Sequence, residues 1–91
     1  MLRVLFSSHG ERAFAVIPRD MQQQVVDVLN GLAEDPEWYR RAKKLGGSEN
    51  RYRLRVGRWR ILFTQSKNII EIADIFMRKG SADYRRRKYL K

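Results

Sequence analysis

The pattern of apolar and polar residues in the first third of the chain predicts one strand followed by two helices. Residues 2–6 form a short apolar run suited to a strand. Ser8 followed by Glu11 fits a capping box, so a helix is expected to begin there. Pro18 ends that helix or opens a second one, whose apolar residues recur at helical spacing to about residue 34. These segments predict a helical hairpin with a proline at its joint.

The second half of the chain predicts an antiparallel sheet. Arginines alternate with apolar residues over positions 51–56, which gives a strand with one apolar and one guanidinium face. Gly57 and Arg58 fit a two-residue hairpin turn, and the return strand covers residues 59–64. After a second tight turn, residues 69–77 are almost continuously apolar, as expected of a central strand covered on both faces.

The order of these elements predicts an α+β fold in one domain spanning residues 1–91. It contains an N-terminal strand, the helical hairpin and a three-stranded antiparallel meander, with the helices on one face of a small sheet. Between hairpin and meander, Trp38 and Tyr39 are expected to anchor a short turn of helix. The hydrophobic fraction of 43% is high enough for a folded core.

Charge is distributed unevenly along the chain. Lys and Arg number 20 against 10 acidic residues, a formal net charge of +10. Residues 1–38 carry 3 basic and 6 acidic residues, whereas residues 39–91 carry the other 17 basic and 4 acidic residues. Such a basic half favours a polyanionic partner, which could be nucleic acid, an anionic membrane surface or an acidic protein segment. A basic surface that only aids solubility is the simpler alternative.

Several classes of site are disfavoured by composition. The chain has no cysteine, so neither a disulfide framework nor a thiolate metal site is expected. A single histidine, His9, cannot build a metal site alone, and we expect no metal and no cofactor. No apolar run approaches the roughly 20 residues that span a bilayer, and the start of the chain lacks a signal-peptide core. We therefore expect a cytoplasmic protein without a membrane partner.

A group of arginines is the strongest candidate site. With a two-residue turn, Val56 pairs with Trp59 and Arg55 pairs with Arg60, and Arg53 lies further along the same face. Like charges placed opposite each other across strands are destabilising by up to about 1 kcal/mol, so a partner for them is expected. Arginine binds phosphate oxygens through two parallel hydrogen bonds, better than lysine does. The alternative is a solvated face of long, charged side chains.

No standard catalytic set accompanies these arginines. Glu71 and Asp74 lie three residues apart on a predicted strand, so they are expected on opposite faces. His9 stands at a predicted helix start, where a surface role is expected. Trp38, Trp59 and Phe63 are expected in the core rather than as platforms for stacked bases. A general base would have to be an unusual residue, a lysine or a tyrosine.

Four parts of the chain together resemble the RelE/ParE toxin superfamily. They are the segment Tyr52–Phe63, the preceding Lys44-Leu45-Gly46, the Ile-Pro joint at 17–18 and the ending Ile75–Tyr84. In that ending an arginine is followed six residues later by a tyrosine, as in the family. The resemblance spans about residues 2–84 and favours the RelE type. It implies the toxin of a type II toxin–antitoxin system, neutralised by a cognate antitoxin. RelE-type toxins cut mRNA in the A site of the 30S ribosomal subunit by attack of a 2′-hydroxyl, leaving a 2′,3′-cyclic phosphate.

The resemblance also implies which residues act. The catalytic positions are matched here by Arg53, Arg55, Arg60, Arg78 and Tyr84. Further contacts with RNA are expected from Lys43, Lys44, Arg58, Lys79, Arg85 and Arg86. By this resemblance, Arg53 and Arg55 would bind the scissile phosphate, and Arg60 and Arg78 would stabilise the negative charge of the transition state. Tyr84 would stack on a base or orient the 2′-hydroxyl.

One departure from the family leaves the general base open. The best-studied cleaving members carry lysine at the two strand positions where this chain has Arg53 and Arg55. Arginine is effectively never deprotonated, so it is a poor base. The base is then Tyr84 or one of the lysines at 43, 44 and 79, or catalysis is slow and driven by charge alone.

Three other functions fit the same features. A ParE-type toxin would share the hairpin and poison DNA gyrase without cutting RNA. A plain RNA- or DNA-binding module would bind with steep salt dependence and leave its ligand intact. An interaction domain would use its basic half only to dock an acidic partner.

Overall fold

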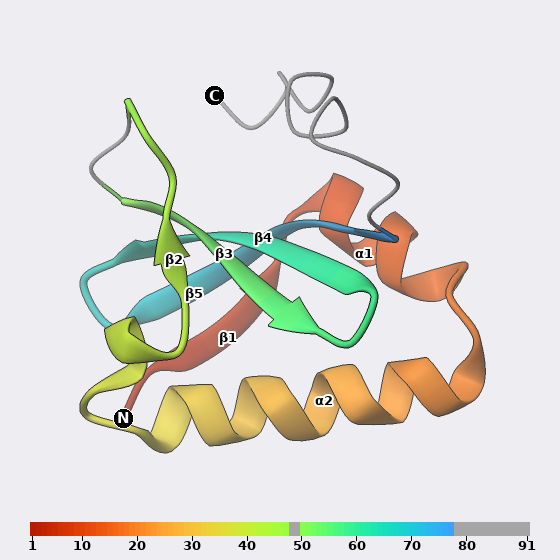
Figure 1. Ribbon diagram of the computed structural model, residues 1–91, viewed down its shortest axis with the longest axis horizontal. Coiled ribbons are helices and arrows are strands. Elements are labelled where there is room, and N and C mark those ends of the chain that lie inside the picture. Colours follow the sequence, from red (N-terminus) through yellow and green to blue (C-terminus); the bar gives the residue numbers. More distant parts are fainter. Residues whose placement is uncertain (48–49, 78–91) are drawn as a thin grey trace.

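A computed structural model describes residues 1–47 and 50–77, and it contains two helices over one mixed sheet (Figure 1). The helices are α1 (Ser8–Ala15) and α2 (Arg19–Glu34), followed by a short 3-10 turn, η1 (Trp38–Arg40). The strands are β1 (Arg3–Phe6), β2 (Lys43–Lys44), β3 (Arg51–Val56), β4 (Trp59–Ser66) and β5 (Ile69–Met77). The α+β class, the order of the predicted elements and the short turn at Trp38 are confirmed.

The strands form a five-stranded sheet in the order β1-β5-β4-β3-β2. β3, β4 and β5 make the predicted antiparallel meander, and β1 pairs with β5 in parallel. β5 therefore lies between β1 and β4, inside the sheet, as its nearly continuous apolar sequence predicts. β2 pairs with the outer edge of β3 and was not predicted, because two residues are too few to show a period.

The β3–β4 hairpin has the predicted register. Arg55 pairs with Arg60 and Val56 with Trp59 across a two-residue turn. Gly57, the first residue of that turn, has a φ of 59°, a left-handed conformation that glycine adopts without steric cost. The turn thus fixes which side chains of the two strands meet on one face.

A bulge in β5 changes the faces of its side chains. Leu62 of β4 pairs with Asp74, but the next residue, Phe63, pairs with Ile72, so Ala73 is an extra residue on β5. Glu71 and Asp74 therefore lie on the same face of the sheet. The expectation that they point to opposite faces was wrong, because it assumed an unbroken two-residue period.

The core lies between the sheet and α2, which runs along one face of the sheet (Figure 1). Val25, Leu29 and Leu32 supply the buried side of α2, as the helical spacing predicts. Asp20 and Asp27 are exposed on the rest of the helix. The opposing strands contribute the buried residues Leu54, Val56, Ile61, Phe63, Ile70, Ile72 and Ile75. The other face of the sheet points away from α2.

α1 lies against β5, beyond the point where β1 ends. Its N-cap is Ser7, whose Oγ accepts a hydrogen bond of 3.0 Å from the amide of Gly10, so the helix begins one residue earlier than a Ser8 cap would give. Gly10 approaches the backbone of β5 so closely that an added Cβ would lie 2.1 Å from the carbonyl oxygen of Ile72. This contact fixes the start of α1 beside the middle of β5.

The segment after α2 is held by a local ion pair. Asp35 accepts a hydrogen bond of 2.8 Å from the amide of Glu37 and one of 2.7 Å from Nε of Arg41. The amide contact first, and then Arg41, lower the pKa of the Asp35 carboxyl. Trp38 packs edge-on against Tyr52, with ring centroids 4.9 Å apart. These contacts position the segment that leads from α2 to β2. Within the described part of the chain, neither helix is long and apolar enough to cross a bilayer.

Candidate nucleic-acid interface

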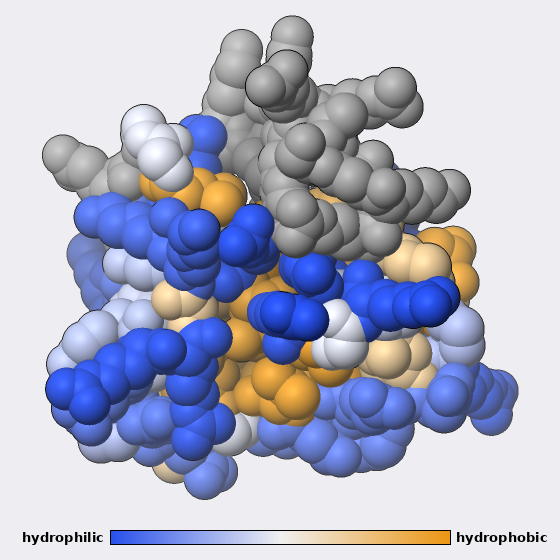
Figure 2. Space-filling model, in the orientation of Figure 1, coloured by the Kyte–Doolittle hydropathy of each residue, from blue (hydrophilic) through white to orange (hydrophobic). Residues whose placement is uncertain are grey.

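A group of cationic side chains lies on the face of the sheet that points away from α2. Lys43 of β2 pairs directly with Arg53 of β3, and Arg55 pairs with Arg60 of β4. Directly opposed residues share a face, and Arg53 and Arg55 share it because they lie two residues apart. We call Lys43, Arg53, Arg55 and Arg60 the basic face. Figure 2 shows hydrophilic residues gathered over β2, β3 and the following hairpin turn, above a hydrophobic band that borders α2.

Arg60 is the buried member of the basic face, with 7% of its surface exposed. Its Nη1 donates hydrogen bonds of 3.0 Å to the carbonyl oxygens of Gly57 and Trp59. These bonds fix the guanidinium at the end of the hairpin. Because Nη1 has two hydrogens and both are used, a phosphate here would be bound through Nε and Nη2.

The other members of the basic face are more accessible. Lys43 and Arg55 are exposed and Arg53 is half-buried. The face is not uniformly basic, since it continues onto β5 with Glu71 and Asp74. The cations are concentrated on β2, β3 and the start of β4, which is where a phosphate would be drawn.

The remaining predicted RNA contacts are placed differently. Lys44 pairs with Tyr52, so it lies on the opposite face of β2 from Lys43. Arg58 is exposed in the hairpin turn, at the edge of the basic face. The predicted residues Arg78, Lys79, Tyr84, Arg85 and Arg86 lie outside the described residues.

His9 and Asp74 form a pair that the sequence did not suggest. Nε2 of His9 lies 3.2 Å from Oδ1 of Asp74, and the same oxygen accepts a hydrogen bond of 2.8 Å from the amide of Ile75. Asp74 has 2% of its side chain exposed, and His9 has 44%. The available signal was an acidic residue within a strand expected to be buried, because such a residue requires a partner.

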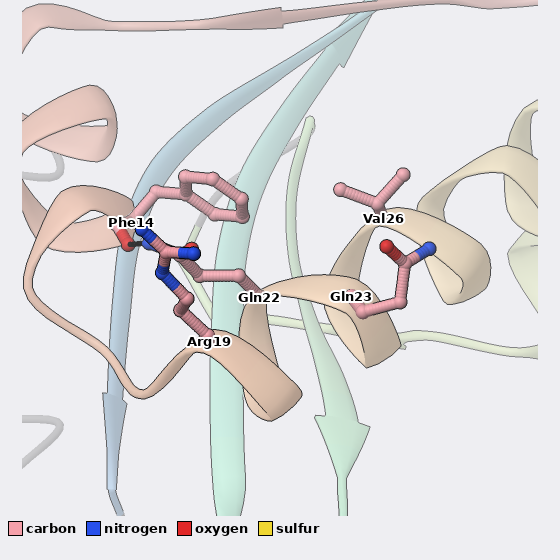
Figure 3. A pocket seen from close by; sticks show the side chains of 5 residues that line it. All are labelled: Phe14, Arg19, Gln22, Gln23 and Val26. Carbon is pink, nitrogen blue, oxygen red and sulfur yellow. Dashed lines mark hydrogen bonds between the residues drawn. The ribbon is translucent and has the colours of Figure 1, made fainter.

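A hollow between α1 and α2 lies outside the basic face (Figure 3). It is lined by Phe14, Arg19, Gln22, Gln23 and Val26. Nε2 of Gln22 donates a hydrogen bond of 2.9 Å to the carbonyl oxygen of Phe14, which ties the two helices together there. The lining offers amide groups and one guanidinium but no carboxylate or nucleophile, so it provides no groups for acid–base chemistry.

The described ranges, 1–47 and 50–77, contain no candidate metal-binding cluster. No three residues among their histidines, aspartates and glutamates come together as ligands of an ion. The chain has no cysteine that could add to them. The chemistry available on the basic face is the binding of anions by guanidinium and ammonium groups.

Comparison of the sequence with known proteins finds no matching family model and no matching curated protein. Solved structures do match. An isolated RelE toxin from Escherichia coli aligns over 100% of both chains, with a TM-score of 0.75 and 12% identity. The RelBE2 toxin–antitoxin complex from Mycobacterium tuberculosis matches over 85% of this chain and 98% of its own, with a TM-score of 0.74 and 21% identity.

A third match comes from an archaeon. The RelB–RelE antitoxin–toxin complex from Methanococcus jannaschii aligns over 88% of this chain and 96% of its own chain, with a TM-score of 0.70 and 22% identity. The alignments cover nearly all of each matched chain, so they concern the whole fold rather than a shared fragment. The chain has the RelE toxin fold.

Proposed function

We propose that this chain is the toxin of a type II toxin–antitoxin system, and that it inhibits translation by cleaving mRNA in the ribosomal A site. The basic face is the observation on which the proposal depends. Lys43, Arg53, Arg55 and Arg60 converge there from three strands, on the side of the sheet that α2 leaves uncovered. The likeness to RelE toxins supports the same function.

The proposed reaction is the attack of an RNA 2′-hydroxyl on the adjacent phosphorus. The bond from phosphorus to the 2′-oxygen forms while the bond to the 5′-oxygen breaks, which leaves a 2′,3′-cyclic phosphate and a 5′-hydroxyl. Negative charge grows on the non-bridging oxygens in the transition state. Fixed cations aimed at those oxygens lower the barrier without having to reorganise.

The members of the basic face would divide this work according to their accessibility. Arg53 and Arg55 bind the scissile phosphate, and Arg60, fixed by the carbonyls of Gly57 and Trp59, stabilises the developing charge. We retain Arg78 for the same charge and Tyr84 for base stacking or orientation of the 2′-hydroxyl, on the basis of the sequence resemblance alone. Lys43 extends the contact along the RNA backbone.

Cleavage of ribosome-bound message tests the proposal. The purified protein is added to ribosomes programmed with a defined mRNA, and the products are mapped by primer extension with identification of their 3′ ends. We expect cleavage at a codon in the A site with a cyclic phosphate end. Arg55→Ala should lower the cleavage rate by about 100-fold, the scale of lost electrostatic stabilisation at one donor.

Arg19→Ala is the matched control for Arg55→Ala. It removes the same charge from an exposed position on α2, beside the hollow of Figure 3 and away from the basic face. It should cleave within about threefold of the wild type, since it changes only the overall field. An mRNA left intact by the wild type, or an equal loss of cleavage rate in both variants, would contradict the proposal. Inhibition of gyrase supercoiling by a protein that does not cut mRNA would favour the ParE-type alternative.

The adjacent lysines of β2 provide a second control. Lys43 shares a face with Arg53, whereas Lys44 shares a face with Tyr52. Lys43→Ala should weaken RNA binding more than Lys44→Ala does, although both remove one charge. Equal dissociation constants for the two variants would show that RNA does not bind along the basic face.

We also propose a cognate antitoxin as the protein partner. Structures of RelE toxins with RelB antitoxins are among those that this fold matches. Co-expression with the product of an adjacent short reading frame should restore growth and yield a co-purifying complex. A toxic chain that no neighbouring product neutralises would contradict this part of the proposal.

A further inference from the structure

The pair formed by His9 and Asp74 joins two elements far apart in the sequence. His9 is the second residue of α1 and Asp74 lies on β5. Nε2 of His9 lies 3.2 Å from Oδ1 of Asp74, and the carboxylate is 2% exposed while the imidazole side chain is 44% exposed. The pair thus has a buried anion behind a ring that reaches solvent.

The bulge at Ala73 brings this pair to the side of the sheet that carries the basic face. Asp74 pairs with Leu62, and two residues further along β5, Phe76 pairs with Arg60. Arg60 and Asp74 are therefore diagonal neighbours on one face, a relation in which Cα atoms lie about 7–8 Å apart. Without the extra residue, Asp74 would point into the core.

The contact between Gly10 and β5 sets the position of the imidazole. The start of α1 lies against the carbonyl group of Ile72, and the Ser7 cap fixes the first turn. His9 is held in that turn, so its ring reaches across the edge of β5 to Asp74. Both partners are thus positioned by backbone contacts on either side of them.

The chemistry of this pair supplies what the arginines lack. A carboxylate can only accept hydrogen bonds, so it favours the imidazole tautomer whose Nε2 carries the proton. Nδ1 then carries the lone pair that can take a proton. Histidine is the side chain best suited to exchange a proton near neutral pH, and an aspartate behind it holds the ring in the tautomer and orientation that this requires.

We propose that His9 is the general base of the RNA cleavage and that Asp74 is its positioning residue; this inference rests on the proposed function. Nδ1 of His9 takes the proton of the 2′-hydroxyl as the 2′-oxygen bonds to phosphorus. The bond from phosphorus to the 5′-oxygen breaks, and that oxygen takes a proton from water. The imidazolium is stabilised by Asp74 and later returns its proton to water, so the enzyme is regenerated.

The test compares the wild type with His9→Gln, His9→Ala and Asp74→Asn on ribosome-bound mRNA. Glutamine keeps an amide donor for Asp74 but cannot act as a base. We expect His9→Gln to cleave about 100- to 10,000-fold more slowly, the usual contribution of general base catalysis, with its RNA dissociation constant within twofold of the wild type. Ser8→Ala, at the exposed neighbour of His9, is the matched control and should cleave normally.

Two further measurements separate catalysis from structure. Added imidazole should restore part of the activity of His9→Ala, because free imidazole can occupy the space left by the ring and take the proton. Asp74→Asn should shift the His9 ring toward the other tautomer, visible in its ¹⁵N chemical shifts, and should lower the cleavage rate without weakening RNA binding. Thermal unfolding of each variant identifies any that has lost its fold.

The outcomes distinguish this inference from the function on which it rests. A wild type that leaves mRNA intact overturns both. A wild type that cleaves while His9→Gln cleaves within threefold of it overturns the inference and leaves the proposed function standing. The inference is also overturned if His9→Gln loses RNA affinity as much as it loses cleavage and imidazole does not restore His9→Ala. That result would assign His9 to RNA binding.

Discussion

Gly10 sits where α1 meets β5, and its missing side chain determines how close the two come. A Cβ added to Gly10 would overlap the carbonyl group of Ile72, so the backbone of α1 or of β5 would have to move. The same contact places His9 opposite Asp74. A single hydrogen in place of a methyl group thus controls both packing and the geometry of the candidate site.

Gly10→Ala should therefore destabilise the protein. The clash is with backbone rather than with a flexible side chain, so the cost should be about 1–3 kcal/mol, the range for overpacked sites. Gly46→Ala is the control, since an added Cβ there meets nothing within 4 Å. It should leave stability unchanged or raise it by up to about 1 kcal/mol. Urea unfolding measures both, and equal midpoints would show that α1 shifts at no cost.

Arg55 and Arg60 face each other yet should differ in what they do for stability. Arg60→Ala removes two charge-assisted hydrogen bonds to backbone carbonyls and should cost about 1–3 kcal/mol. Arg55 is exposed, and Arg55→Ala relieves repulsion with Arg60, so stability should stay constant or rise by a few tenths of a kcal/mol. Thermal unfolding of the two variants measures this difference in stability. Equal stabilities would show that the hydrogen bonds of Arg60 do not stabilise the fold.

At the scale of elements, α2 has one face in the core and one in solvent. Adjacent valines show the boundary, because Val25 is 0% exposed and Val26 is 37% exposed. Val26 borders two surface hollows, one shared with Phe14 and the other with Val4 and Phe6. The helix packs against one face of the sheet, and the basic face lies on the other.

Val25→Ala and Val26→Ala form a matched pair for this boundary. Val25→Ala leaves a cavity against the sheet and should lower the free energy of unfolding by about 2 kcal/mol. Val26→Ala should change it by less than about 0.5 kcal/mol, because the side chain is already partly in water and alanine favours the helix. Chemical denaturation of both variants measures the difference, and similar losses would mean that α2 packs in another rotation.

The elements differ in how far the sequence predicts them. The turn and register of the β3–β4 hairpin are predicted correctly because alternation and the Gly57 turn are both local signals. The bulge at Ala73 is not, since an extra residue in an apolar run leaves no mark in the pattern. β1 is predicted as a strand, but its parallel partner depends on contacts across the whole chain.

The same division applies to the candidate site. Arg53, Arg55 and Arg60 are found from their alternation alone, and Lys43 joins them only through the pairing of the unpredicted β2. The partnership of His9 and Asp74 depends on the bulge and on the approach of Gly10 to β5. Both are long-range packing features, so no local pattern carries them.

At the scale of the whole molecule, the charges are separated in space as well as in sequence. The exposed Asp20 and Asp27 lie on α2, behind the sheet, and the basic face lies on its other side. An approaching polyanion is attracted by one side and repelled by the other. This polarity orients the encounter before any specific contact forms.

RNA binding should accordingly weaken steeply with salt. Three to four phosphate contacts on a single strand give a slope of about −2 to −3 in a plot of log binding constant against log salt concentration. Neutralising Lys43 should make that slope less negative by about 0.7, the contribution of one contact. Fluorescence anisotropy with a short RNA measures it, and a slope near zero would exclude backbone contacts as the main source of affinity.

The parallel pairing of β1 with β5 also dictates when the protein can fold during its own synthesis. Among the described residues, β1 pairs only with β5, the last strand of the sheet to be translated, and the core lacks Ile70, Ile72 and Ile75 until β5 is made. Closing so long a loop slows folding, and a shortened chain has no sheet in which to place its N-terminus. Prematurely terminated products should therefore be inert and quickly degraded.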